Sequence, residues 1–85
     1  MTDMNNYSVM LVDDEEDVIQ AILHKMDWEA MGYMKPEYAH NGLEALDLAE
    51  NHTPDVVMTD IKMPYMDGLE LSRKLKEQYP NIRII

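Results

Sequence analysis

Short apolar runs alternate along the sequence with longer stretches in which apolar residues recur at helical spacing. Two of these runs, Val9–Val12 and Val56–Thr59, are almost wholly apolar, which is typical of strands buried on both faces of a sheet. One of the others contains Pro36 and is expected at the edge of the sheet, where a strand tolerates proline. The predicted strands are residues 7–12, 34–40, 56–59 and 82–85.

Three amphipathic helices are predicted between these strands. The first should begin near Asp14 and end before Gly32, because glycine commonly follows the last turn of a helix. The second and third should each begin at a capping sequence, in which Asn41 or Asp67 precedes a glutamate by three positions. In the second helix we expect Leu43, Leu46 and Ala49 to face inward. The apolar residues that recur at helical spacing in the first helix are Val18, Ile19, Ile22, Leu23 and Met26, and the third helix runs through Leu71, Leu75 and Tyr79.

The order of elements is therefore βαβαβαβ. Strands that alternate with crossover helices predict an α/β fold, with a parallel sheet and helices on its faces. The 85 residues are enough for one domain, and no linker or internal repeat divides them. We therefore expect residues 1–85 to belong to a single domain.

Composition narrows the classes of function. Seven Lys and Arg against 17 Asp and Glu give a net charge of −10, which disfavours direct binding of a nucleic acid. The absence of cysteine excludes disulfides and thiolate metal sites. The sequence shows no signal peptide and no apolar stretch long enough for a membrane span, so we expect a soluble, cytoplasmic protein.

Acidic residues directly follow two of the predicted strands. Asp13 and Asp14 leave the first strand, and Asp60 leaves the third. Taken singly, acids here favour a helix N-terminus or cap a turn. Sites in parallel α/β folds gather at the carboxyl ends of the strands, so together the three carboxylates predict an acidic site for a divalent cation such as Mg²⁺. Near such a cation a carboxylate can also accept a phosphoryl group.

The residues around these acids resemble the receiver domain of bacterial response regulators. The similar segments are Val9–Glu15, Asn41–Leu46 and Asp55–Leu71, of which the part from Asp60 to Gly68 is the most specific. Residues 27–33 also resemble receivers fused to an AraC-type DNA-binding domain. The resemblance implies a flavodoxin-like three-layer fold and a signalling module, not an enzyme. A histidine kinase would supply its phosphoryl group, and DNA would be contacted only by a further domain.

The resemblance also implies roles for individual residues. Asp60 would be the phosphoacceptor, Asp14 would bind Mg²⁺ directly, and Asp13 would bind it mainly through water. The backbone carbonyl of Lys62 would be a further ligand, while Pro64 and Gly68 would shape the loop behind the site.

The family's Ser or Thr after the fourth strand and its Lys after the fifth have no counterpart here. The resemblance therefore implies an incomplete receiver, truncated after the start of the fourth strand, that lacks the last strand and the last two helices. We expect such a chain to self-associate or to be marginally folded, because apolar surface and a strand edge would stay open.

Two other functions remain open on sequence grounds. One is a phosphohydrolase with an aspartyl nucleophile, but such enzymes place a second acid two residues later, where this chain has Lys62. The other is an interaction fragment whose acids are chemically idle. The three histidines His24, His40 and His52 are widely spaced and are expected at the surface or at helix ends.

Overall fold

The computed structural model describes residues 6–85 and confirms the predicted alternation of strands and helices. Each predicted element is present; β3 has its predicted bounds, and the other three strands are shorter than the runs that predicted them. The elements are β1 (Val9–Val12), α1 (Glu16–Lys25), β2 (Glu37–Ala39), α2 (Gly42–Asn51), β3 (Val56–Thr59), α3 (Gly68–Gln78) and β4 (Arg83–Ile84).

The four strands form one parallel sheet in the order β2-β1-β3-β4. Strand β1 is central, and its last residue, Val12, is in register with Ala39 of β2 and Thr59 of β3. The residues that follow these three strands therefore leave the sheet side by side. Strand β2 lies at an edge, as the proline before it predicted.

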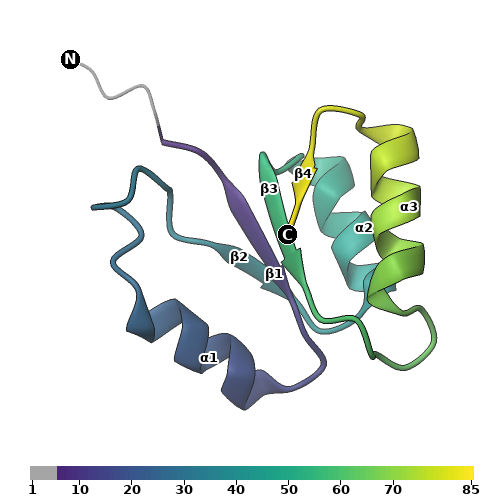
Figure 1. Cartoon of the computed structure of the whole chain (residues 1–85), viewed down its shortest axis with the longest axis horizontal. Helices are drawn as coiled ribbons and strands as arrows, with labels where there is room; N and C mark the ends of the chain where they lie inside the picture. The colour runs from purple at the N-terminus through teal and green to yellow at the C-terminus, as the bar shows by residue number, and fades with distance from the viewer. Residues whose placement is uncertain (1–5) are drawn as a thin grey trace.

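The helices form layers on both faces of the sheet, with α1 on one face and α2 and α3 on the other (Figure 1). Alternate residues of β1 supply the two apolar cores. Val9 and Leu11 pack with Trp28 on the α1 face, whereas Met10 and Val12 pack in the cluster that α2 and α3 cover. All four residues of β1 are buried, which explains the unbroken apolar run in the sequence.

Gly32 led us to expect that the first helix continues almost to that residue. Helix α1 ends earlier, at Lys25. The reason is Trp28, whose buried ring packs against β1 and whose indole N–H donates to the Leu23 carbonyl (3.2 Å). The chain then turns, and Gly32 adopts φ 90° at the end of that turn instead of ending the helix. Glycine is suited to this left-handed conformation because it has no Cβ.

The expectation that Leu43 faces inward is wrong. Its side chain is 64% exposed, and the buried residues of α2 are Gly42, Ala45 and Ala49. These three share one face of the helix at spacings of three and four residues. A Cβ at Gly42 would approach the Met66 sulfur to 2.7 Å, so the start of α2 lies close against the β3–α3 loop.

Within residues 6–85, no helix is both long enough and apolar enough to cross a membrane.

Candidate functional site

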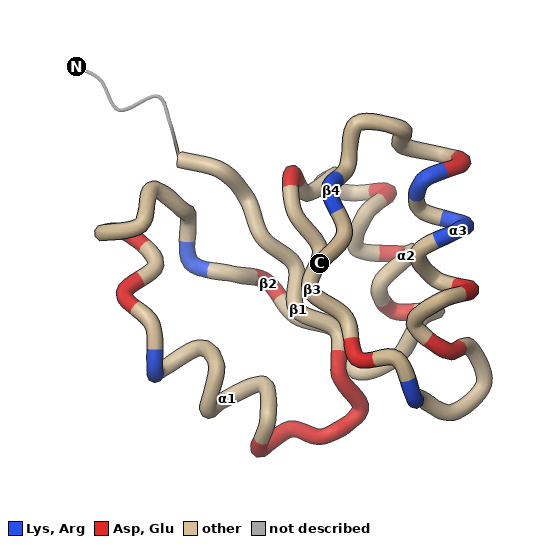
Figure 2. The backbone as a smooth tube through the Cα atoms, viewed as in Figure 1, with Lys and Arg blue, Asp and Glu red and all other residues tan. Residues whose placement is uncertain are grey.

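The predicted acidic residues meet at the carboxyl end of the sheet. Carboxylate oxygens of Asp13, Asp14 and Asp60 lie within 4.8 Å of one another. They converge because β1 and β3 are neighbours in register, so the segments leaving both strands start at the same edge. Figure 2 shows the acidic segment between β1 and α1 beside the end of β3.

Backbone hydrogen bonds continue past the ends of the strands and fix where the acids begin. The amide of Asp13 donates to the Ala39 carbonyl (3.1 Å), and the amide of Asp60 donates to the Val12 carbonyl (2.9 Å). The Asp13 side chain then accepts from the amide of Glu15 (2.9 Å), which closes the turn that contains Asp14. The positions of two acids therefore follow directly from the sheet.

The backbone after Asp60 is held from behind by the start of α3. The Ile61 amide donates to Asp60 Oδ1 (2.8 Å), and the Gly68 amide donates to the Ile61 carbonyl (2.7 Å). A Cβ at position 68 would lie only 2.2 Å from the Asp60 carbonyl oxygen, so glycine is required there. Tyr65, at the tip of the loop, has φ 72° and is 93% exposed.

Nothing in the described part of the chain neutralises the three acids: none of them forms an ion pair with Lys, Arg or His. Carboxylates this close repel one another unless a proton or a cation lies between them. An oxygen-only ligand set suits a hard divalent cation such as Mg²⁺ or Ca²⁺. Lys62 is exposed, and its proposed role as a backbone ligand stays a prediction.

A cleft of about 200 Å³ opens beside the acids. Asp13, Thr59 and Asp60 supply its polar wall, and its other wall is apolar. The apolar residues are Leu11, Val12, Ile19, Ile22, Met58 and Ile85. The acidic group is therefore accessible from solvent on one side and bounded by apolar side chains on the other.

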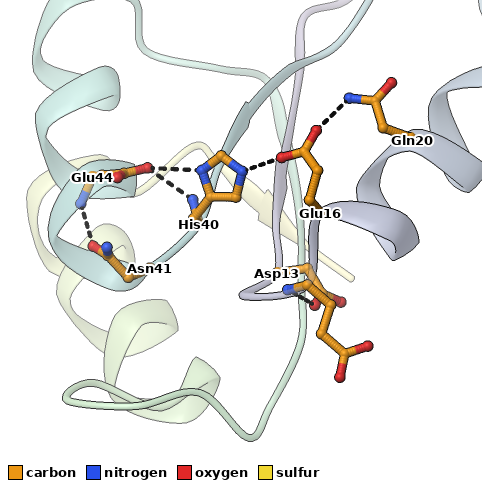
Figure 3. A network of polar contacts seen from close by, with 7 residues as sticks. Asp13, Glu16, Gln20, His40, Asn41 and Glu44 are labelled. Carbon is orange, nitrogen blue, oxygen red and sulfur yellow. Dashed lines mark hydrogen bonds and ion pairs between the residues drawn. The ribbon is translucent and has the colours of Figure 1, made fainter.

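One polar network next to the acids was missed by the sequence analysis, which treated His40 only as a surface histidine. The ring contacts Glu16 of α1 through Nε2 and Glu44 of α2 through Nδ1 (3.4 Å) (Figure 3). The hydrogen bond to Glu16, more than any other cause, raises the pKa of His40 above its usual value. The same bond, followed by one from Gln20, lowers the pKa of the Glu16 carboxyl.

The sequence matches the response regulator receiver domain family over residues 9–85. The chain belongs to this family. A transcriptional regulatory protein of Bacillus subtilis, YesN, is 37% identical over 93% of this chain and 22% of its own length. Sporulation initiation phosphotransferase F of the same organism is 38% identical over 96% of this chain and 64% of its own length. The receiver thus spans less than two thirds of either relative.

Solved receiver structures agree with the fold described above. A two-component transcriptional regulator AraC from Clostridium phytofermentans superposes with a TM-score of 0.88 at 30% identity, over 93% of this chain and 64% of that one. The receiver domain of AraT from Geobacillus stearothermophilus gives 0.85 at 36% identity, over 92% and 60%. The resemblance to receivers, including those of AraC-type regulators, is therefore confirmed, as is the α/β fold with its parallel sheet.

Proposed function

We propose that this receiver accepts a phosphoryl group on Asp60, with Mg²⁺ held by Asp13, Asp14, Asp60 and the backbone carbonyl of Lys62. The observation that carries the proposal is the convergence of three unneutralised carboxylates within 4.8 Å at the carboxyl end of β1 and β3. Membership of the receiver family supports the reaction class, because these domains act in two-component signalling.

The transfer uses the Asp60 carboxylate as the nucleophile. A carboxylate oxygen forms a bond to phosphorus while the bond from phosphorus to the donor's imidazole nitrogen breaks, and the released nitrogen keeps the electron pair and takes up a proton. Bound Mg²⁺ would offset negative charge on the phosphoryl oxygens. The Ile61 amide holds Oδ1 of Asp60, which orients the carboxylate for attack.

The partner that donates the phosphoryl group is, on this proposal, a histidine kinase. The product would alter the surface around the site and so change which output partner is contacted. Transcription is the proposed output, since several similar proteins are transcriptional regulators, among them YesN and the AraC protein of Clostridium phytofermentans. DNA contact would fall to another domain, because this one carries a net charge of −10.

The direct test is intact-mass spectrometry after incubation with acetyl phosphate and Mg²⁺. We expect one phosphoryl adduct on the chain, none with Asp60→Asn, and none when the metal is chelated. Asp17→Asn is the matched control, because Asp17 is an exposed acid of the same segment that lies outside the cluster. No adduct on the unmodified chain, or an adduct that survives Asp60→Asn, would contradict the proposal. The first result would favour an idle interaction fragment.

A further inference from the structure

Helix α1 begins without a side-chain cap of its own. Its N-cap residue, Glu15, makes no capping hydrogen bond, whereas Asn41 and Asp67 cap α2 and α3 through bonds of 2.8 Å. An uncapped start leaves amide groups unsatisfied and the first turn prone to fray. This first turn directly follows the segment that carries Asp13 and Asp14.

The start of α1 is instead tied to the segment leading into α2. Glu16, the first residue of α1, contacts the Nε2 atom of His40 and also accepts from Gln20 (2.6 Å) (Figure 3). Among the described residues, Glu16 is the only α1 side chain that forms a hydrogen bond or ion pair with a side chain outside the helix. Helix α1 is otherwise held by packing, and only Ile19 of it is fully buried.

His40 is itself fixed on its other side. Its backbone amide donates to Glu44 Oε1 (2.9 Å), the same oxygen that its Nδ1 approaches at 3.4 Å. Glu44 in turn is part of the capping arrangement of α2, since its amide donates to Asn41 Oδ1. The ring therefore spans from the capped start of α2 to the uncapped start of α1.

The sheet places this link beside the acidic site. His40 follows Ala39, and the Ala39 carbonyl accepts from the Asp13 amide, so His40 and the acidic turn leave adjacent strands. The turn of Asp13 and Asp14 is thus held at one end by β1 and at the other by the contact between Glu16 and His40. This contact also directs the Glu16 carboxylate toward the imidazole and away from Asp13 (Figure 3).

We propose that His40 is a positioning residue for the Mg²⁺ site, acting by holding Glu16 and so the turn that carries Asp13 and Asp14. The inference rests on the proposed function, because it assumes that these acids bind Mg²⁺. Removal of groups that orient metal ligands commonly lowers metal affinity by about 10- to 100-fold. His40 acts through Glu16 and the turn, so the expected effect is smaller, about 3- to 10-fold.

The test is a titration of the ¹⁵N-labelled chain with MgCl₂, followed by NMR. The amides of Glu15 and Ile61 are the reporters, because they donate to the Asp13 and Asp60 carboxylates. We expect His40→Ala to raise the half-saturating Mg²⁺ concentration about 3- to 10-fold. A role in folding alone would shrink the folded signals and leave the half-saturating concentration unchanged, which would overturn the proposal.

Two substitutions at His40 separate its two contacts. Glutamine places an amide N–H near the position of Nε2 and should restore the unmodified affinity through Glu16. Asparagine mimics Nδ1, which faces Glu44, and should behave like alanine. The reverse order of the two variants would contradict the assignment to Glu16.

The matched control is His52→Ala. His52 makes a similar contact, 3.4 Å from Glu37, but it follows α2 and faces the start of β2, at the opposite end of the sheet from the acids. It should leave Mg²⁺ binding unchanged; the same loss in both variants would overturn the inference. No Mg²⁺ response in the unmodified chain would overturn the proposed function and this inference together. An unaltered response in His40→Ala would overturn this inference alone.

Discussion

Replacing Gly68 with alanine should impair phosphorylation more than it impairs stability. The added Cβ would lie 2.2 Å from the Asp60 carbonyl oxygen and 2.9 Å from the Ile61 Cα, and both atoms belong to backbone. The nearer contact must widen by about 0.8 Å to reach the 3.0 Å at which Cβ contacts begin to occur. The shift falls on the proposed phosphoacceptor itself, because no flexible side chain can absorb it.

Two opposing effects set the change in unfolding free energy of Gly68→Ala, and the displacement of Asp60 sets the change in phosphorylation rate. Overpacking costs about 1–3 kcal/mol, whereas alanine in place of glycine in a helix stabilises by up to about 1 kcal/mol. The net loss of unfolding free energy should be about 1–2 kcal/mol. Misplacement of a reacting group by about 1 Å can lower a rate by about 100-fold, so we expect the phosphorylation rate to fall by about 30- to 100-fold.

The matched variant is Gly42→Ala. Its Cβ would also clash, but with the Met66 side chain, whose sulfur at 2.7 Å can move by rotation about its bonds. We expect a loss below about 1 kcal/mol and an unchanged rate. Urea unfolding gives the stabilities, and the growth of the phosphoryl adduct with acetyl phosphate gives the rates. A Gly68→Ala chain that is more stable than the unmodified chain, or equally fast, would refute the reasoning.

Three further predictions follow from the structure. Asp67→Ala removes the cap that accepts from the Glu70 amide and should cost about 1 kcal/mol in urea unfolding, with Asp67→Asn close to unchanged. His40 has a raised pKa, so its stabilising contact is fully present below about pH 6.5 and is lost as pH rises through the higher folded value. The stability difference between the unmodified chain and His40→Ala should therefore shrink as pH rises above about 6.5. The change should be small because both partners are substantially exposed, and a difference that grows with pH would count against the prediction. Finally, Ile85 belongs to the apolar wall of the cleft and is exposed, which favours self-association. Sedimentation velocity would show this as a concentration-dependent mass, and a cooperatively unfolding monomer at all concentrations would exclude it.

The acidic site could be predicted because its geometry is set by the backbone. Asp13 and Asp60 each follow an apolar run, and parallel pairing alone brings the ends of such runs together. Asp14 directly follows Asp13, so the prediction needed only the ends of the two strands and the residues next to them. The same reasoning placed the caps at Asn41 and Asp67, which depend only on local spacing.

Features that depend on how the helices pack on the sheet could not be predicted as well from the sequence. Periodicity gives the spacing of an apolar stripe but not which stripe faces the sheet, so Leu43 was placed inward although Gly42 and Ala45 occupy that face. The contact of His40 with Glu16 joins residues 24 apart and depends on where α1 lies over the sheet. The one feature of the sequence that could have indicated this contact is the position of His40, directly after a predicted strand and before a helix cap.

The central position of β1 has a consequence for how the chain folds. Strand β1 pairs with β2 through residues 27 apart, such as Met10 and Glu37, but its pairing with β3 joins residues 47 apart, such as Val9 and Val56. Closing so long a loop costs conformational entropy before the stabilising contacts form, so this pairing slows folding relative to local pairing. Asp13 and Asp14 therefore meet Asp60 only after β1 and β3 have joined. A cation bound by all three acids would consequently bind the folded chain and not the unfolded one, and its concentration would set the folding equilibrium by mass action.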